Sequence, residues 1–395
     1  MNDRILYVWL HQALGNANRL SREIFKKFKS VSEIYSCDDF SFLGSDKEKY
    51  IKRLEYKDVS EAFETVKACR NLGASIVGYY DELYPERLRA IPNPPVALYA
   101  IGNFKKLDEL PCVAVVGTRN PTEGGVTATE SFSYVFASSG ICVISGLAKG
   151  IDVSAHRGCV AANGYTVAVL GCPIGEIYPK ENEKAYKALY ERGLVISEMY
   201  PRCPKTRVDF PNRNRIIAAL SDSVVVTEAG ARSGALITAS YALEYGKRLY
   251  SVPGAVCPET EGTNGLLKRG ASVMTEPYDV ISPLTLEYPA TVRPYEPELI
   301  KDLLSYGISS RNRARKPETK TKAPEPFAPA EEIKDDSLSP LGKKIIALFS
   351  EKDCLSVDEM CARLGILSKD ILSELTMLEI EERVSSVPGG RYVLL

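Results

Sequence analysis

Short apolar runs separated by segments of helix length dominate the middle of this 395-residue chain. Because these runs are apolar throughout and do not alternate with polar residues, they are typical of strands covered on both faces of a parallel sheet. The intervening segments have the length of covering helices, and the chain therefore predicts a doubly wound, mostly parallel α/β sheet. The expected strands are Val113–Val116, Ile141–Ile144, Thr166–Leu170, Leu194–Ile196, Val224–Thr227 and Leu249–Val252; the expected helices include Thr122–Ser138, Asp152–Asn163 and Ala235–Gly246.

Two smaller domains are expected on either side of this sheet. Residues 1–80 carry an amphipathic helical pattern that follows a tight turn at 14–18, which predicts a small helical domain of the SAM or helix-hairpin-helix type. The sheet domain then covers 81–290, and a charged, proline-rich linker covers 291–336. Beyond it, residues 337–395 predict a winged-helix module from three helices, Leu341–Phe349, Ser356–Leu364 and Ser368–Glu379, and a hairpin around 388–390. Ser356 and Glu359 have the spacing of a capping box at the second of these helices.

The overall charge of the chain gives no indication of its ligand, because the net charge is only −1. A local cluster does stand out: five basic residues between positions 202 and 215 face a single acid, Asp209, for a local balance of +4. These basic residues are Arg202, Lys205, Arg207, Arg213 and Arg215.

Composition also narrows the location and the chemistry. The ten cysteines include no C-x-x-C pair and there are only two histidines, so we expect buried free thiols and no metal site. No apolar run approaches the roughly 20 residues of a membrane span, and the N-terminus lacks a basic leader with a cleavage site. A cytoplasmic protein that does not enter the membrane is therefore expected.

The turns that follow the strands carry glycines, hydroxyls and cations. In a parallel sheet these turns meet at one edge, where ligands bind. Glycine lets backbone N–H groups approach an anion, and the helix N-terminus behind the turn adds its dipole. Several such turns side by side suit a chain of phosphates better than a single one. The turns read Gly117-Thr118-Arg119, Ser145-Gly-Leu-Ala-Lys149, Tyr178-Pro-Lys-Glu-Asn182 and Glu228-Ala-Gly-Ala-Arg-Ser-Gly234.

A dinucleotide or a nucleoside triphosphate fits these turns less well. The first turn reads G-T-R-N-P-T-E-G-G, which lacks the G-x-G-x-x-G spacing, and no Walker A sequence occurs anywhere. We therefore expect no bound cofactor.

Taken in order, the motifs resemble the DNA-processing protein A family (DprA, also called Smf). They are Val116-Gly-Thr-Arg119, Ser145-Gly-Leu-Ala-Lys-Gly-Ile-Asp152 with His156, Ala168-Val-Leu-Gly171, Tyr178-Pro-Lys-Glu-Asn182, Phe210-Pro-Asn-Arg-Asn-Arg-Ile-Ile217, Glu228-Ala229, Ser233-Gly-Ala-Leu-Ile-Thr-Ala239, Val252-Pro-Gly254 and Gly262-Thr-Asn-Gly265. The match covers about 80–285. It implies a Rossmann-like core that binds single-stranded DNA without sequence preference, forms a homodimer and loads the recombinase RecA during natural transformation (competence) and recombination.

The resemblance also implies which residues contact the strand. The positions expected at phosphate are Gly117, Thr118, Arg119, Ser145, Gly146, Lys180 and Asn182, with Arg213 and Arg215 as additional cations. Lys149 stands where the family more usually has arginine, and it keeps the charge but loses bidentate pairing. Tyr178 is a candidate stacking platform beside Lys180, with packing against the core as the alternative.

Three other polar residues invite a catalytic interpretation. Asp152 and His156 have the i, i+4 spacing of an acid–base pair, but Asp152 stands where a helix N-cap is expected, so we favour structural hydrogen bonding. Glu228 follows a strand, and we expect it to organise the turn by hydrogen bonding. No catalytic residue is therefore assigned, and the protein is not expected to be an enzyme.

Two alternatives belong to other functional classes. Nucleotide phosphoribohydrolases of the LOG (lysine decarboxylase-like) type share the arrangement, but their P-G-G-x-G-T-x-x-E turn is replaced here by Thr227-Glu-Ala-Gly-Ala-Arg-Ser-Gly234. The winged helix could instead read duplex DNA in a regulator. However, residues 336–395 hold seven basic and ten acidic residues, a balance of −3, which duplex phosphates would repel. A protein-contact or regulatory role is expected for this module.

Overall fold

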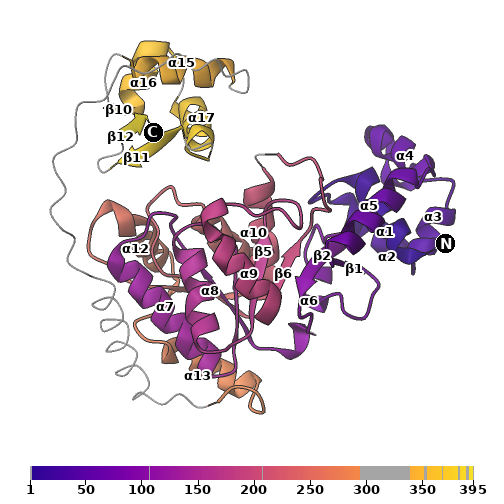
Figure 1. Cartoon of the computed structure of the whole chain (residues 1–395), viewed down its shortest axis with the longest axis horizontal. Coiled ribbons are helices and arrows are strands. Elements are labelled where there is room, and N and C mark those ends of the chain that lie inside the picture. Colours follow the sequence, from indigo (N-terminus) through magenta and orange to yellow (C-terminus); the bar gives the residue numbers. More distant parts are fainter. Residues whose placement is uncertain are drawn as a thin grey trace. The chain divides into compact units, whose positions relative to one another are not determined.

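The computed structural model describes residues 2–105, 107–206, 208–293, 339–350, 354–366, 368–380, 383–387 and 391–394 (Figure 1). The chain divides into two compact units, 1–314 and 315–395. Almost all of the expected linker 291–336, and the turn of the expected C-terminal hairpin at 388–390, lie outside the described residues.

A nine-stranded sheet forms the centre of the first unit, in the order β1-β2-β6-β5-β4-β3-β7-β8-β9. All neighbouring pairs from β6 to β9 are parallel, and the residues of β3 to β7 are buried throughout, which explains their unbroken apolar sequence. The predicted doubly wound, mostly parallel sheet is confirmed. The parallel strands are β3 (Cys112–Val116), β4 (Cys142–Ser145), β5 (Thr166–Leu170), β6 (Leu194–Ser197), β7 (Ser223–Val226), β8 (Arg248–Ser251) and β9 (Ser272–Val273).

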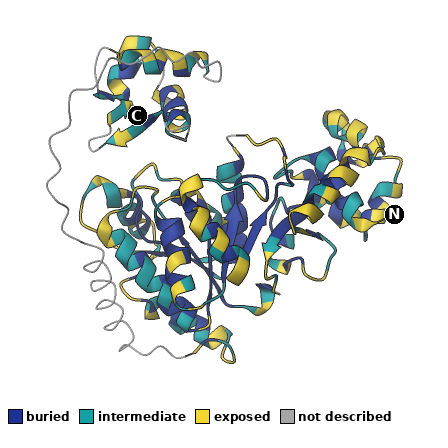
Figure 2. Ribbon diagram, viewed as in Figure 1, coloured by how far each residue is buried: buried dark blue, intermediate teal, exposed yellow. Residues whose placement is uncertain are grey.

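Helices cover both faces of the sheet, so the strands form a buried layer between exposed helices (Figure 2). Alternate residues of each strand point to opposite faces. Val113 and Val115 of β3 share a core with α7 (Glu123–Ser138), α8 (Ile151–Ala161) and α13 (Tyr278–Glu287). Ala114 and Val116 pack instead with α10 (Asp209–Leu220) and α11 (Ala235–Glu244). The chain therefore changes faces between β3 and β7. The remaining helices of this region are α9 (Glu183–Arg192) and α12 (Glu261–Lys268), with short 3-10 turns η3 (Leu107–Glu109), η4 (Lys180–Asn182) and η5 (Pro258–Thr260).

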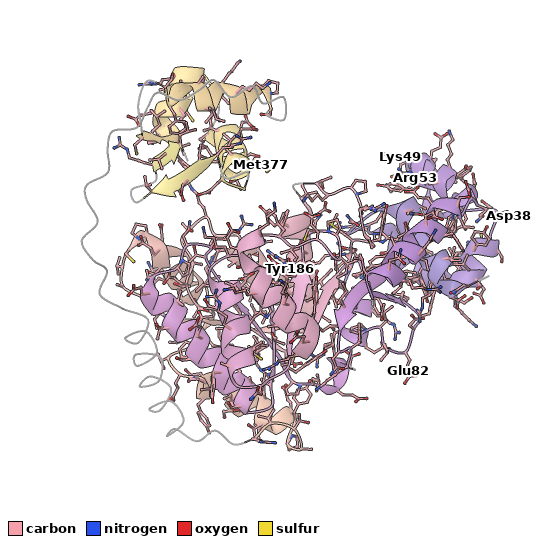
Figure 3. All side chains as sticks on the ribbon, viewed as in Figure 1. Asp38, Lys49, Arg53, Glu82, Tyr186 and Met377 are labelled. Atoms are coloured by element: carbon pink, nitrogen blue, oxygen red, sulfur yellow. The ribbon has the colours of Figure 1, made fainter. Side chains whose placement is uncertain are left out.

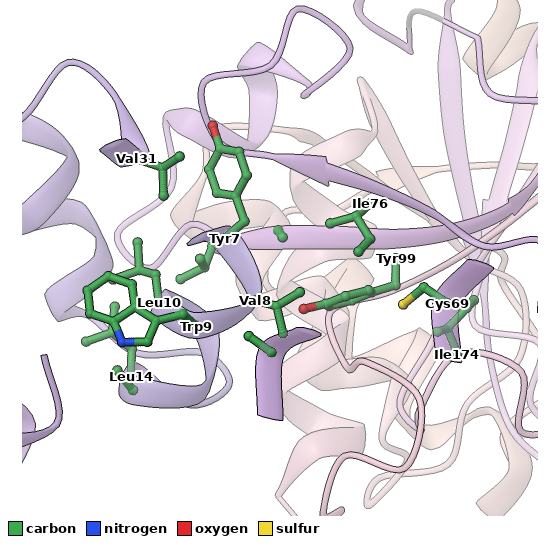
Figure 4. Packing of buried hydrophobic residues seen from close by; sticks show 14 of the residues in the cluster. Tyr7, Val8, Trp9, Leu10, Leu14, Val31, Cys69, Ile76, Tyr99 and Ile174 are labelled. Atoms are coloured by element: carbon green, nitrogen blue, oxygen red, sulfur yellow. The ribbon is translucent and has the colours of Figure 1, made fainter. Parts of the chain in front are cut away.

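The N-terminal helices pack directly on this sheet. Two antiparallel strands, β1 (Ser75–Gly78) and β2 (Ala97–Gly102), extend the sheet beyond β6, and the expected boundary at residue 80 falls between them. Trp9 and Leu10 of the first helix belong to the same buried cluster as Tyr99 of β2 and Ile174 (Figure 4). The elements before β2 are α1 (Asp3–Leu14), α2 (Leu20–Lys27), α3 (Val31–Ser36), η1 (Ser41–Leu43), η2 (Ser45–Lys47), α4 (Glu48–Glu55), α5 (Ser60–Asn71) and α6 (Glu86–Arg89).

The second unit is a winged helix with a core of its own. Three helices pack around buried residues that include Ile345, Met360 and Leu375, and the strands order as β10-β12-β11. The capping box is confirmed: Glu359 N–H donates to the Ser356 hydroxyl (3.2 Å), and Ser356 N–H donates to the Glu359 carboxylate (2.8 Å). The elements are α15 (Pro340–Leu348), β10 (Cys354–Ser356), α16 (Val357–Leu364), α17 (Ser368–Ile380), β11 (Val384–Val387) and β12 (Arg391–Leu394).

Candidate nucleic-acid interface

Three exposed cations follow three neighbouring strands of the sheet. Arg119 comes after β3, Lys149 after β4 and Lys180 after β5, at the shared carboxyl edge of these parallel strands. None of the three side chains forms a hydrogen bond or an ion pair with any residue that the structure describes. Their charge is therefore available to a ligand on this edge.

The turn after β3 is fixed by the turns on either side of it. Thr118 N–H donates to the Glu228 carbonyl (2.7 Å), and the Thr118 carbonyl accepts from Ile151 N–H (3.1 Å). A Cβ on Gly117 would lie 2.6 Å from Ile151 Cγ1, so only glycine allows this approach. The backbone that leads into Arg119 is therefore held in place by its neighbours, and Gly117 and Thr118 in this turn are half-buried.

Ser145 and Gly146, at the end of β4, face the interior. The Ser145 hydroxyl is buried and donates to the Val115 carbonyl (2.6 Å). A Cβ on Gly146 would lie 2.6 Å from both the Arg213 guanidinium and the Asp152 carboxylate. The structure therefore places these two residues behind the surface that Lys149 presents.

Arg213 connects the loop after β4 with the end of strand β5. Its guanidinium is 8% exposed and donates to the Gly146 carbonyl (2.7 Å) and to the Val169 carbonyl. Burial raises the pKa of the Asp152 carboxyl, and the positive charge of Arg213 acts in the opposite direction. Arg213 therefore contributes to the edge by holding loop backbone in place.

The expected N-cap role of Asp152 is wrong in detail. The N-cap of α8 is Gly150, and Asp152 lies buried in the first helical turn. His156, one turn further along, binds Thr166 Oγ1 through Nδ1 (2.7 Å), and burial together with Arg213 lowers the pKa of His156 to about 3. The hydrogen-bond partner of His156 is thus Thr166 and not Asp152, which favours the structural interpretation over an acid–base pair.

The loop after β5 holds Lys180 between two anchored residues. Asn182 is buried and donates to the Leu147 carbonyl (2.9 Å). Tyr178 is half-buried, and its backbone carbonyl accepts from the hydroxyl of Tyr186, a fully buried residue of α9 (Figure 3). The Tyr178 ring packs at 5.5 Å from the Phe210 ring, centroid to centroid.

The basic cluster at 202–215 does not form one surface. Arg202 and Lys205 are exposed, and Lys205 pairs with Glu176, whereas Arg207 lies outside the described residues. Arg215 is fully buried and binds the Glu198 carboxylate (2.6 Å). Glu198 also accepts from Ala17 N–H (3.0 Å), so this ion pair ties the N-terminal turn to the sheet and does not face the edge.

The N-terminus of α7 already holds a carboxylate. Glu228 is buried and accepts from the backbone N–H of Thr122 (2.8 Å) and from its hydroxyl (2.5 Å). The expectation that Glu228 organises the turn is confirmed. The further expectation that every helix N-terminus behind these turns is open to a ligand anion is wrong at α7, because an internal acid occupies the position where doubly wound folds hold a pyrophosphate.

Sequence patterns missed two residues of this edge. Arg232, exposed on the loop after β7, lies within a motif whose glycines were its most conspicuous feature. Thr122 is the N-cap of α7, and a threonine directly before a helical segment is the signal that could have identified it.

Other kinds of site find little support in the described part of the chain. All ten cysteines are free, and six of them are buried. No three histidine, cysteine or acidic side chains gather as a metal site within the described ranges. No described helix is both long and apolar enough to cross a membrane.

Together these features define a class: a Rossmann-like α/β protein with cations along the carboxyl edge of its sheet and an internal carboxylate bound at the N-terminus of α7. Comparison with known proteins places the chain within that class. A family model described as DNA recombination-mediator protein A matches residues 75–285, and a DprA winged helix domain model matches 325–390. The chain belongs to this family, DprA/Smf.

Individual relatives agree with this assignment. Protein Smf of Synechocystis is 34% identical over 316 residues, which cover 79% of this chain and 78% of the relative. The structure of DNA processing protein A from Streptococcus pneumoniae is 28% identical with a TM-score of 0.60, covering 71% of this chain and 98% of that chain. The Helicobacter pylori structure, described in terms of that protein's single-stranded DNA binding mode, is 30% identical with a TM-score of 0.50, covering 54% and 97%.

Proposed function

We propose that this protein binds single-stranded DNA without sequence preference along the carboxyl edge of its sheet. The observation that carries the proposal is the row of exposed, unpaired cations Arg119, Lys149 and Lys180 on adjacent strands. Neighbouring strands lie about 4.8 Å apart, so these residues follow a line across the edge. Contacts to phosphates along such a line provide affinity but carry no base sequence information.

The interior residues of the edge have a different role in this proposal. Arg119, Lys149 and Lys180 contact phosphates, assisted by the backbone of Gly117 and Thr118. Ser145, Gly146, Asn182 and Arg213 hold the loops in the shape that presents them. Asn182 and Arg213 donate to the loop carbonyls of Leu147 and Gly146, and Ser145 donates to the Val115 carbonyl of β3. Arg215 acts at a greater distance, through the Glu198 pair.

Tyr178 adds a stacking surface. One part of its ring packs on Phe210, and the Lys205 ammonium lies 5.6 Å from the ring centroid. The residue is only half-buried, so part of it is accessible to a nucleobase. Stacking of a base on an aromatic side chain contributes about 1–3 kcal/mol and tolerates any base.

Family membership supports the wider role. We propose that the protein acts in the cytoplasm as a homodimer, loads RecA onto the bound strand during natural transformation and recombination, and uses no catalytic step. Light scattering of the full chain tests the dimer. Incubation with nucleoside monophosphates tests the absence of hydrolase chemistry, since release of free base would support the LOG-type alternative.

Filter binding at several salt concentrations tests the interface. Each phosphate contact contributes about 0.7 to the slope of log affinity against log salt for a single strand. Arg119→Ala and Lys180→Ala should each weaken binding of every sequence and reduce that slope by about 0.7. Lys268→Ala is the matched control, because exposed Lys268 precedes β9 at the opposite edge. Unchanged affinity in both edge variants would place the site elsewhere.

A further inference from the structure

Arg232 lies on the loop after β7, on the far side of the point where the chain changes faces. Its side chain is exposed and forms no hydrogen bond or ion pair with the described residues. β7 is parallel to β3 and directly beside it, with Val226 opposite Val116. The loop of Arg232 is therefore the immediate neighbour of the loop of Arg119 on the same edge.

The backbone around Arg232 is held from several sides. The Gly234 carbonyl accepts from Asn214 Nδ2 (3.2 Å), and Ser233 N–H donates to the Gly230 carbonyl (3.1 Å). On the other flank, the Ala229 carbonyl accepts from Gly262 N–H (2.8 Å). A cation on a braced loop loses little backbone freedom when it binds a ligand.

The one acid among residues 227–234, Glu228, is buried and bound to Thr122, so it does not pair with Arg232. The first turn of α11, directly after it, contains no acid, whereas α8, α10 and α12 each begin with one. One strand further on, the pattern ends: residues 252–267, after β8, contain no lysine or arginine and include Glu259 and Glu261. The row of cations thus reaches β7 and stops there.

We propose that Arg232 is a further phosphate contact that carries the bound strand across the face-change point and marks one end of its path. This inference rests on the proposed function of the edge. From β5 to β7 there are three strand spacings, or roughly 14 Å. With about 3.4 Å per stacked nucleotide, the path from Lys180 to Arg232 holds roughly four nucleotides.

Oligodeoxythymidine length separates this inference from the proposed function. Affinities of the full chain are measured for lengths from about 3 to about 12 nucleotides, a range that includes the usual site sizes of such proteins. For the longer strands, Arg232→Ala should reduce the salt slope by about 0.7, which corresponds to about fivefold weaker binding at 0.1 M salt. For about 3 nucleotides the effect should vanish, because so short a strand can bind between Arg119 and Lys180 alone.

Two further variants, together with Arg119→Ala, make the outcomes distinct. Arg232→Lys keeps the charge and should restore most of the slope. Arg269→Ala, an exposed arginine before β9 at the opposite edge, should change nothing. If Arg119→Ala weakens binding and Arg232→Ala does not, the inference fails and the proposed function stands. If neither variant weakens binding, both fail. An equal loss at every length, accompanied by a lower melting temperature, would show a structural role and overturn the inference.

Discussion

The Glu228 carboxylate and Thr122 close the first turn of the sheet edge through two hydrogen bonds, at 2.8 and 2.5 Å. Thr122 is itself the N-cap of α7, and its hydroxyl accepts from Gly125 N–H (3.0 Å). Glu228, which follows β7, thus supplies the negative charge that the N-terminus of α7 favours. The same contact removes this N-terminus from the positions open to a ligand phosphate.

Replacing Glu228 by glutamine should lower the free energy of unfolding by about 1–3 kcal/mol. Glutamine keeps the shape but loses the charge, and its amide places donors against the donors of Thr122. Denaturant unfolding measures the change. Glu191→Gln is the control, because Glu191 is exposed at the C-terminal end of α9, where loss of an acid should cost nothing. Equal stability of the Glu228 variant and the wild type would contradict this role.

Two neighbouring glycines test the same contact by steric means. A Cβ on Gly125 would lie 2.3 Å from the Glu228 carboxylate, whereas a Cβ on Gly124 would meet nothing closer than 3.7 Å. Gly124→Ala should therefore raise stability by up to about 1 kcal/mol through helix propensity. Gly125→Ala should lower it and shift the melting temperature in the opposite direction. Parallel shifts in the two variants would argue against a packed Glu228–Thr122 contact.

Local patterns predicted the sheet because each buried parallel strand carries its own signal. All six apolar runs became strands, from β3 to β8, with bounds within one or two residues. Three strands of the sheet were missed: β1, β2 and β9. β2 joins the sheet by pairing with β6, more than ninety residues away, and β9 is only two residues long. A boundary at residue 80 was the natural interpretation of helical sequence, and only this long-range pairing shows that the sheet extends past it.

The sequence predicts the exposure of a cation where that exposure follows from its position on a loop. It does not predict exposure where a partner from another part of the chain buries the side chain. Arg119, Lys149 and Lys180 lie on turns at a sheet edge, and the structure exposes all three. Arg213 and Arg215 lie two residues apart on α10 and so point in different directions, yet both are buried. Their partners, the Gly146 carbonyl and Glu198, come from other loops, and no spacing within α10 reveals them.

The buried ion pair of Arg215 and Glu198 should contribute to the stability of the fold and not to the electrostatic binding of DNA. Arg215→Met leaves Glu198 buried without its partner, which typically costs about 3–5 kcal/mol. Adding Glu198→Gln should recover part of that loss, because the unpaired charge is removed. The salt slope of single-strand binding should stay unchanged in the folded double variant. A fall of about 0.7 would instead place Arg215 at a phosphate.

His156 should make the protein less stable below neutral pH. Its pKa is lowered to about 3 by burial and by Arg213, while in the unfolded chain it titrates near the ordinary 6.5. Between these values the unfolded state binds a proton that the folded state does not, so stability is complete above pH 6.5 and falls as the pH decreases toward 3. The loss should approach about 1.4 kcal/mol per pH unit for this one group.

A variant isolates this histidine from the other groups that titrate. The Thr166 hydroxyl donates to the Val143 carbonyl (2.7 Å), so it accepts from His156 Nδ1–H. Asparagine can supply a similar donor without a titrating ring, and His156→Asn should therefore show a shallower loss of unfolding free energy between pH 6.5 and 5 than the wild type. Identical pH profiles for the two proteins would contradict the shifted pKa.

The C-terminal winged helix should contribute little to the affinity for DNA. It forms a separate compact unit with its own buried cluster, so removing residues 336–395 should leave the sheet domain folded. The exposed side chains that the structure describes on α17 (Ser368, Asp370, Ser373 and Thr376) include no cation. Two further acids of that helix are engaged internally: Glu374 accepts from the Ser339 hydroxyl, and Glu379 accepts from Ser386 N–H (2.9 Å).

The module as a whole carries seven basic and ten acidic residues, so its net charge repels a polyanion. Single-strand affinity and its salt slope should therefore agree within about twofold between the full chain and the deletion variant. A gel shift with single strand, duplex and RNA, run on both proteins, measures this. A large loss of single-strand binding, or duplex binding that only the full chain shows, would make the winged helix a DNA-binding element and overturn its assignment as a surface for protein partners.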